Sequence, residues 1–183
     1  MTLVAIAAVE TSSIAQGVVA ADAMLKTAEV ELLESATLSP GRYWVLVGGD
    51  VATVRASHRR GVEVAADTLL DQLLIPQIHE GVLPALRGIA RAGEDDALGI
   101  LETLTAASAI VSADTAIKAA NVTIRDIRLA NGIGGKGVVT LSGTVSAVQA
   151  AVEAGRADAL KRGLLARSVV IPRLDPQLRR RIG

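Results

Sequence analysis

The sequence predicts an α+β protein made of two tandem domains, each with the element order β-α-β-β-α-β and helices packed on an antiparallel sheet. Three observations lead to this prediction. The chain contains a long internal repeat, each copy places a helical apolar spacing after a short apolar strand, and Gly or Pro turn signals separate neighbouring strands. A chain of 183 residues is compatible with two small domains, and half of it is hydrophobic, enough for a core in each.

The internal repeat is clearest where residues 9–30 recur as residues 101–122, an offset of 92 positions (Glu102 minus Glu10). Nine of these 22 aligned positions are identical, and they include a matched Glu, Thr, Asp and Lys. The offset grows to 94 at Gly61 and Gly155 and to 96 at the later Ile-Pro dipeptides, which indicates short insertions in loops of the second copy. We therefore assign a first domain to residues 1–92, a linker to 93–96 and a second domain to 97–183.

In the first copy, residues 10–13 offer hydroxyl caps for a helix. The turn signal Ser39-Pro40-Gly41 joins two strands into a hairpin, Asp50 caps a second helix, and Pro76 suits an edge strand. The expected order is strand 3–9, a helix carrying Ile14, Val18, Ala21 and Leu25, strands 30–38 and 42–47, a second helix, strand 73–78 and a short helix within 81–92.

The second copy follows the same order. Its first helix repeats the apolar spacing with Ala106, Ile110, Ala113 and Ile117. The expected elements are strand 97–101, helix 106–120, strand 122–129, a glycine-rich loop, strand 138–142, helix 145–154 and strand 169–171.

Composition excludes several classes of function. Nineteen basic and nineteen acidic residues give zero formal net charge, which argues against a general nucleic-acid binder, and the final Arg179-Arg180-Arg181 is expected to be a solvated tail. The chain has no cysteine, so thiolate metal sites and Cys-ligated clusters are excluded. No apolar run reaches the ~20 residues that span a bilayer, and no basic residue precedes the apolar residues 3–9 as in a signal peptide. We expect a soluble, cytoplasmic protein that binds neither membranes nor nucleic acid.

Catalysis and nucleotide binding have little support. His58 and His79 are the only histidines and have no partners at metal-ligand spacing. Residues 132–137 match the pattern G-x-G-x-x-G, but a strand follows where the dinucleotide motif requires a helix. Glu10 and Glu102, which follow the first strand of each copy, are better interpreted as paired or capping carboxylates at a subunit contact than as an acid/base pair. We expect no enzyme activity.

The residues together resemble the bacterial microcompartment shell domain. The resemblance rests on the Glu-Thr opening, the Asp-x-x-x-Lys-x-Ala-x-Val helix end, the hairpin tips, the Gly-Asp-Val-x-x-Val helix start and the Ile-Pro-Gln/Arg strand. Both copies match, so the chain looks like a tandem-domain shell protein of the propanediol-utilisation type with unpermuted repeats.

The resemblance implies a structural role in the shell of a bacterial microcompartment. Three chains would form a homotrimeric pseudohexamer, which would tile edge to edge with other shell proteins around encapsulated enzymes. A small-molecule-binding regulatory protein remains the alternative, because domains of this size and element order also occur as ligand sensors and fold does not fix function.

The resemblance also places a pore for small metabolites at the hairpin tips. Some similar proteins hold an iron-sulfur cluster on a cysteine at the position of Ser39, and a neutral hydroxyl binds iron poorly compared with thiolate, so no cofactor is expected here. The pore residues would be Leu38, Ser39, Pro40 and Gly41 in the first tip, and Gly132, Ile133, Gly134, Gly135 and Lys136 in the second.

The shell edge would be formed by Lys26 and Lys118, which end the first helix of each copy, and by Arg173, the match for the family's edge arginine. In the first copy that arginine position is Gln77, followed closely by His79, so this edge departs from the family pattern. Without the resemblance, the two lysines would be interpreted as residues that complement helix dipoles.

Overall fold

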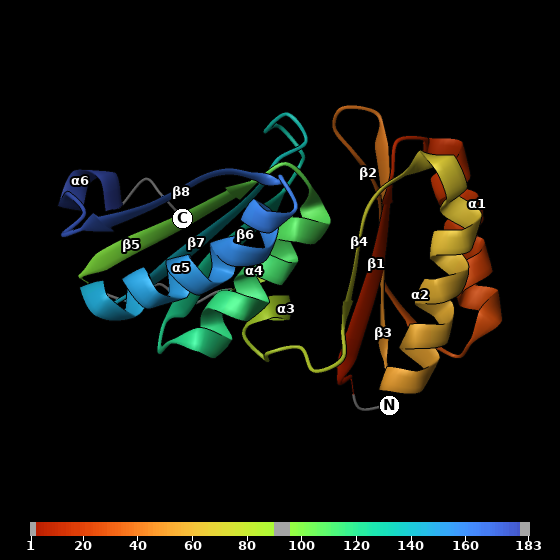
Figure 1. Ribbon diagram of the computed structural model, residues 1–183, viewed down its shortest axis with the longest axis horizontal. Helices are drawn as coiled ribbons and strands as arrows, with labels where there is room; N and C mark the ends of the chain where they lie inside the picture. Colours follow the sequence, from red (N-terminus) through yellow and green to blue (C-terminus); the bar gives the residue numbers. More distant parts are fainter. Residues whose placement is uncertain (1–2, 90–95, 180–183) are drawn as a thin grey trace. The chain divides into compact units, whose positions relative to one another are not determined.

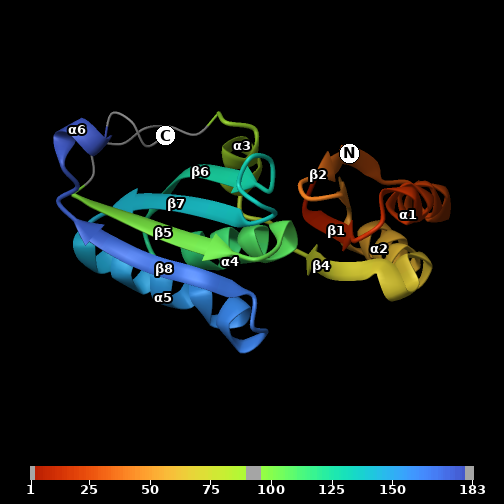
Figure 2. The same cartoon turned by 90° about the horizontal axis from the view of Figure 1, so that it is seen from above.

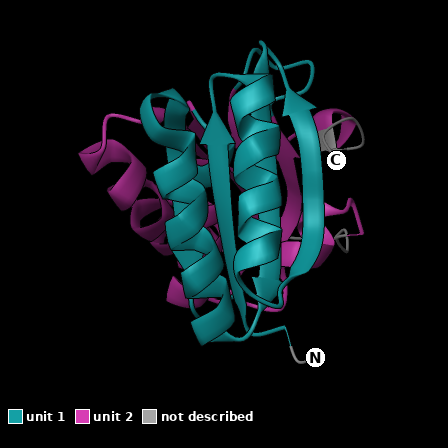
Figure 3. Ribbon diagram, turned by 90° about the vertical axis from the view of Figure 1, so that its right-hand side faces the viewer, with its two compact units in different colours: residues 1–78, 105–107, 130–135 teal, residues 79–104, 108–129, 136–183 magenta. Residues whose placement is uncertain are grey.

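The structure is a computed structural model that describes residues 3–89 and 96–179. The chain forms two compact units (Figure 3). The first contains the residues up to 78 together with 105–107 and 130–135, and the second contains 79–104, 108–129 and the residues from 136 onward. Each unit has its own four-stranded antiparallel sheet.

The first unit has the strand order β2-β3-β1-β4, and helices α1 and α2 cover one face of its sheet (Figure 1). Its elements are β1 (Ala5–Thr11), α1 (Ile14–Thr27), β2 (Glu31–Leu38), β3 (Arg42–Gly49), α2 (Val51–Ala65), the 3₁₀ turn η1 (Ala66–Thr68) and β4 (Leu69–Ile75).

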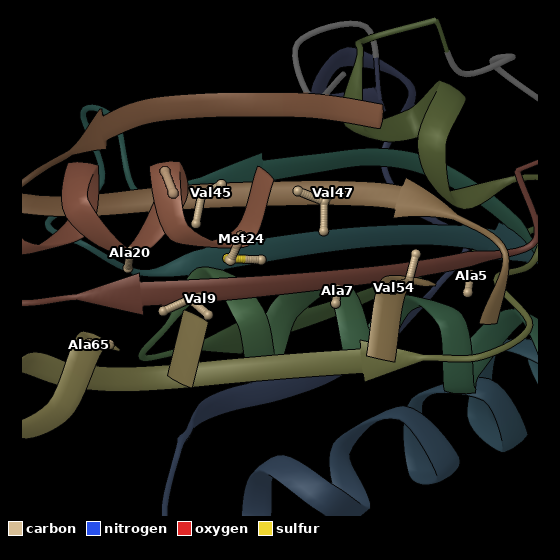
Figure 4. Packing of buried hydrophobic residues seen from close by; sticks show 10 residues of the cluster. Ala5, Ala7, Val9, Ala20, Met24, Val45, Val47, Val54 and Ala65 are labelled. Atoms are coloured by element: carbon tan, nitrogen blue, oxygen red, sulfur yellow. The ribbon is translucent and has the colours of Figure 1, made fainter. Parts of the chain in front are cut away.

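The helices of the first unit begin where side chains can cap them. The Ser13 hydroxyl accepts a hydrogen bond from the backbone N–H of Gln16, and the Asp50 carboxylate accepts from those of Ala52 and Thr53. Small apolar side chains from both helices and the sheet fill the core between them (Figure 4). Ten buried residues make up this core: Ala5, Ala7, Val9, Ala20, Ala21, Met24, Val45, Val47, Val54 and Ala65.

The second unit repeats this arrangement with the strand order β6-β7-β5-β8 and helices α4 and α5 on one face of the sheet (Figure 2). Its elements are α3 (Val82–Leu86), β5 (Ala97–Thr103), α4 (Ala106–Ala119), β6 (Thr123–Leu129), β7 (Gly137–Gly143), α5 (Val145–Lys161), β8 (Leu165–Pro172) and α6 (Pro176–Arg179).

The predicted order of elements is confirmed in both copies, and the differences lie at element ends. Strand β4 starts at Leu69 instead of 73 and ends before Pro76, and it is an edge strand of its sheet as expected. Helix α5 continues seven residues beyond 154 to Lys161, β8 starts at Leu165 instead of 169, and α6 was not predicted. Residues 93–95 of the predicted linker lie outside the described residues, and the domain boundaries stay a prediction.

Three of the four apolar positions predicted for α1 lie outside its buried face. Ile14, Val18 and Leu25 are between 38% and 49% exposed, whereas the buried positions of the helix carry Gly17, Ala20, Ala21 and Met24. The reason is the close approach of the helix to the sheet. A Cβ atom at Gly17 would lie only 2.5 Å from the Cβ of Tyr43, so only a small residue fits at this contact.

Within residues 3–89 and 96–179, no helix combines the length and the apolar character that crossing a membrane would require.

We predict that Gly17→Ala lowers the stability of the protein. Alanine favours a helix over glycine by about 1 kcal/mol, but the added methyl group would overlap Tyr43 and overpacking costs roughly 1–3 kcal/mol. The measurement is the midpoint of thermal unfolding, with the exposed Ala15→Gly on the same helix as the control for propensity alone. A higher midpoint for Gly17→Ala would show that the close contact between helix and sheet is wrong.

Candidate functional site

The first hairpin tip presents a small polar surface. Ser39, Pro40 and Gly41 are exposed between β2 and β3, and Gly41 has a φ of 67°, which suits glycine. Leu38 is only 2% exposed and belongs to the core. Of the four residues predicted for this side of the pore, three are therefore at the surface, and the prediction for Leu38 is corrected because its side chain points into the protein.

The second tip is a glycine-rich turn between β6 and β7. Gly132, Gly134 and Gly135 all have positive φ values, between 66° and 82°, so this turn depends on glycine. The backbone N–H groups of Ile133 and Gly135 donate to the carbonyl of Ala130, at 3.3 and 3.4 Å, and hold the turn together. Gly132 and Gly134 are exposed, Ile133 is half-buried and Gly135 is buried.

The two tips lie side by side within the first unit. A Cβ atom on Gly135 would lie 3.0 Å from the carbonyl oxygen of Ser39 and 3.1 Å from the ring of Pro40. The Arg42 guanidinium also donates a hydrogen bond of 3.3 Å to the carbonyl oxygen of Gly135. The structure thus brings together the two segments that the sequence assigned to one pore, with backbone carbonyls and a hydroxyl as their polar groups.

Below the tips, the Glu10 carboxylate is completely buried in the first unit. One of its oxygens accepts a hydrogen bond of 2.8 Å from Arg42 Nη1, and the other accepts from the backbone N–H groups of Ala106 at 2.9 Å and Ala107 at 3.5 Å. Burial raises the pKa of Glu10 above its ordinary value of 4.5, while Arg42 and the two amides oppose that rise. The carboxylate therefore caps the start of a helix and anchors the arginine that contacts the second tip. These contacts lie within one chain, whereas the sequence placed the paired carboxylate at a subunit contact.

The repeat counterpart of this pair is Glu102 with Lys136 in the second unit. Lys136 Nζ lies 2.5 Å from Glu102 Oε1, and the two side chains stay 44% and 30% exposed. Glu10, by contrast, is 0% exposed. Lys136, which the sequence predicted as a source of positive charge at the pore, has its charge compensated by this carboxylate.

The predicted edge lysines both pair with an aspartate one helical turn earlier. Lys26 lies 2.8 Å from Asp22 on α1, with 75% and 59% of their side chains exposed. Lys118 lies 2.5 Å from Asp114 on α4, whose side chain is only 8% exposed. The other Asp114 oxygen accepts a hydrogen bond of 2.8 Å from the backbone N–H of His79.

The remaining two predicted edge residues are at the surface. Gln77 and Arg173 follow β4 and β8 respectively, and both are exposed. Arg173 has a φ of 53°, and its backbone N–H donates to the carbonyl of Asp96 at 2.6 Å. The structure thus joins His79 to Lys118 through Asp114.

Sequence reasoning missed the partners of Glu10 and a second polar contact in the first unit. The Thr105 hydroxyl donates a short hydrogen bond to the buried carboxylate of Asp71. A signal for the arginine did exist, because Arg42 and Lys136 occupy the same repeat position at an offset of 94 and both are basic. No such signal marked Asp71, whose counterpart at an offset of 96 is Arg167.

The described part of the chain offers few side chains that could bind a metal ion or act in catalysis. Residues 3–89 and 96–179 contain no cluster of three or more His, Asp or Glu side chains arranged to hold a metal ion. Between α2 and β4 there is a hollow of about 680 Å³ lined by Arg55, His58 and Arg59 above an apolar floor. Burial lowers the pKa of His58, which favours the neutral imidazole there.

We predict that Arg42→Met destabilises the protein by roughly 3–5 kcal/mol at neutral pH, because a buried carboxylate loses its charge partner. Since the folded-state pKa of Glu10 is raised, this group stabilises the fold at low pH, and that contribution is lost as the pH rises through the raised pKa. Arg42 lowers the pKa of Glu10, so its removal raises that pKa further and the deficit should grow as the pH rises above the ordinary pKa of a glutamate.

The measurement is denaturant unfolding at several pH values. The matched control is Lys136→Met, which breaks the exposed counterpart pair and should cost less than about 1 kcal/mol. Equal, pH-independent losses in both variants would contradict the role given to Glu10.

Comparison with known proteins identifies the family. The family model described as the BMC domain matches residues 5–78 and again 97–174. The chain is 44% identical over 169 residues to the bacterial microcompartment shell protein PduT of Citrobacter freundii, covering 92% of each chain. A crystal structure of a microcompartments protein from Desulfitobacterium hafniense DCB superimposes with a TM-score of 0.86 at 46% identity, covering 98% of this chain and 99% of that one.

A fused, permuted hexameric shell protein of the RMM microcompartment is more distant, with a TM-score of 0.64 at 26% identity over 86% of this chain and 84% of that one. The match to the family model covers both sequence repeats, and it agrees with the two four-stranded sheets and their helices. The chain belongs to the BMC-domain family and carries two BMC domains in tandem.

Proposed function

We propose that this chain is a structural shell protein of a bacterial microcompartment. Three copies close into a plate with six BMC domains, the hairpin tips surround a central opening for small metabolites, and the plates tile edge to edge with other shell proteins around the encapsulated enzymes. The three relatives described above support a shell role, and two of them are named as shell proteins. They give no support to a regulatory ligand sensor.

The main observation in support of a trimer is that equivalent positions on the first helices of the two repeats differ in solvent exposure. Val18 on α1 is 49% exposed, whereas its counterpart Ile110 on α4 is 0% exposed. Ile14 is 43% exposed, whereas its counterpart Ala106 is 0% exposed. A helix that is covered in one repeat and bare in the other suggests that a second copy of the chain covers the bare one.

The paired carboxylates support the same closure. In the first unit, Glu10 caps the helix that begins at Ala106. The counterpart of that helix is α1, which begins at Ile14, and the counterpart of Glu10 is the half-exposed Glu102. In the trimer, Glu102 of one copy receives the exposed start of α1 from the next copy, so the intramolecular contact is reproduced between molecules. Three repetitions of this contact close a ring.

The opening is expected to be small and polar. Three Ser39 hydroxyl groups and the backbone of the glycine-rich tips would line it, and the basic residues beneath them, Arg42 and Lys136, are neutralised by Glu10 and Glu102. Such a lining favours passage of small polar metabolites over binding of one ligand. We further propose that the chain itself has no catalytic activity.

The first test concerns the bare face of α1. We predict that Val18→Glu converts the trimer into single chains, because a carboxylate would be buried without a partner at the contact between copies. The control is Leu160→Glu, at an apolar residue on α5 that is 57% exposed and is assigned no contact. The mass is measured by size exclusion with light scattering, against a chain mass of 18.8 kDa. A Val18→Glu protein that keeps three times this mass would contradict the interface.

A second test concerns the tile edge. We predict that Lys26→Glu combined with Lys118→Glu leaves trimers intact but abolishes sheets and tubes in negative-stain electron microscopy, because each change reverses a charge at the plate rim. Lys161→Glu, at the last residue of α5, is the control and should leave sheets unchanged. Sheets that form normally from the double variant would remove these lysines from the edge.

A third test concerns the tip at Ser39. We predict that the protein purified without oxygen, and then supplied with iron and sulfide, retains no iron-sulfur cluster, because a serine hydroxyl is a poor ligand compared with thiolate. The measurement is the iron content per trimer after desalting, with the visible absorption spectrum as a second readout. About one cluster per trimer would refute this proposal.

A further inference from the structure

We propose that a segment near the C-terminal end of one copy, residues 175–178, docks on the corner between α1 and β2 of the neighbouring copy, formed by Asp22, Leu25 and Leu32. This inference rests on the proposed trimer and specifies a contact that holds it together. The ligand of the corner is thus a second copy of this chain, and the docking segment is its α6 region.

The template for this contact is visible in the second unit. There, the segment that follows β4 packs against the end of α4 and the start of β6. The backbone N–H of His79 donates to Asp114 at 2.8 Å, and a Cβ atom on Gly81 would lie 2.9 Å from Cδ1 of Ile117. Val82, the first residue of α3, is 0% exposed, and Ile124 of β6 is 3% exposed. This segment, residues 78–82, therefore covers a corner of the domain formed by Asp114, Ile117 and Ile124, and we call it the clasp.

The sequence repeat supplies a second clasp and a second corner. At an offset of 96, the residues Ile78, His79, Gly81 and Val82 correspond to Leu174, Asp175, Gln177 and Leu178. At an offset of 92, the corner residues Asp114, Ile117 and Ile124 correspond to Asp22, Leu25 and Leu32. The apolar character of the clasp is kept, since Ile78 and Val82 are matched by two leucines at the same spacing.

The second corner and the end of the second clasp are exposed in the single chain, whereas Leu174 at the start of that clasp is only 6% exposed. Leu25 is 38% exposed, Leu32 is 44% exposed and Leu178 is 46% exposed. The Asp22 side chain is 59% exposed, against 8% for Asp114, which receives the His79 amide. An exposed Leu178 and an exposed corner of matching chemistry on the same molecule fit a contact that forms when copies join.

The occupant is a second copy because the chain's own first clasp is already engaged. Residues 79–86 follow the first domain and are packed in the second unit, so one clasp and one corner are satisfied within the molecule. A ring of chains satisfies the remaining pair in every copy without leaving an unmatched end. In that ring the Asp175 N–H would donate to Asp22, as the His79 N–H donates to Asp114.

The test uses cross-linking by introduced cysteines. The natural chain has no cysteine, so any disulfide that forms must join the introduced residues. In the double variant Leu25→Cys with Gln177→Cys, the two thiols correspond to the Gly81 and Ile117 contact of the second unit. Diamide oxidises each thiol pair to a disulfide and is itself reduced to the hydrazine. We expect a covalently closed three-chain species on a non-reducing gel, absent from both single-cysteine variants.

The matched control is Gly81→Cys with Ile117→Cys, which should lose its free thiols while it still migrates as one chain. The mass measured by light scattering before oxidation tests the proposed trimer separately from the docking of the clasp. A three-chain mass without intermolecular cross-links would overturn the clasp and leave the shell function standing. A disulfide formed within a single chain of the Leu25→Cys, Gln177→Cys variant would also overturn the proposed docking. A single-chain mass for the unmodified protein would overturn the proposed function itself.

Discussion

A buried carboxylate constrains much of the first unit. Glu10 lies on the central strand β1, completely shielded from water, and an unpaired charge in that position would be costly. Its oxygens are satisfied by Arg42 from the start of β3 and by the two amides that open α4. These partners come from sequence positions far apart, so one side chain fixes the position of a helix start and of an arginine. That arginine in turn contacts the glycine-rich tip at Gly135.

The second constraint is the small size of the side chains between helices and sheets. Alanine and glycine allow α1 to approach the sheet so closely that its larger apolar residues, Ile14, Val18 and Leu25, remain outside. A single folded chain therefore keeps an apolar helix face for association. On α4 the counterparts of Ile14 and Val18, Ala106 and Ile110, are already buried, whereas on α1 these positions stay exposed in the single chain.

Much of the fold could be predicted from the sequence because its signals are local. Ser13 and Asp50 cap the helices that the sequence placed after them, and the turn at Ser39-Pro40-Gly41 joins β2 to β3. The starts of β4 and β8 were placed too late, since both strands begin with a mixture of apolar and polar residues without a continuous apolar run. Helix α5 was placed too short because Gly155 directly follows the predicted end at residue 154. Gly155 packs against α4 instead of ending the helix, which continues to Lys161.

The candidate site was less accessible to sequence reasoning. The glycine pattern identified the second tip, but Leu38 was assigned to the opening although its side chain faces the core. The Asp114–Lys118 pair follows the local Asp-x-x-x-Lys pattern, but the hydrogen bond from His79 to Asp114 joins residues 35 positions apart, and no local pattern encodes it. The sequence also does not show that Glu10 is buried and Glu102 is half-exposed, because both residues occur in the same dipeptide, Glu-Thr.

The proposed arrangement of three doubled chains around one opening is tested most directly by imaging the purified wild-type protein in vitreous ice. The expected particle has three-fold symmetry and six similar lobes around a central hole, with the two kinds of hairpin tip alternating at its rim. Particles of one chain, or an assembly in which the two domains of a chain occupy dissimilar surroundings, would contradict the account.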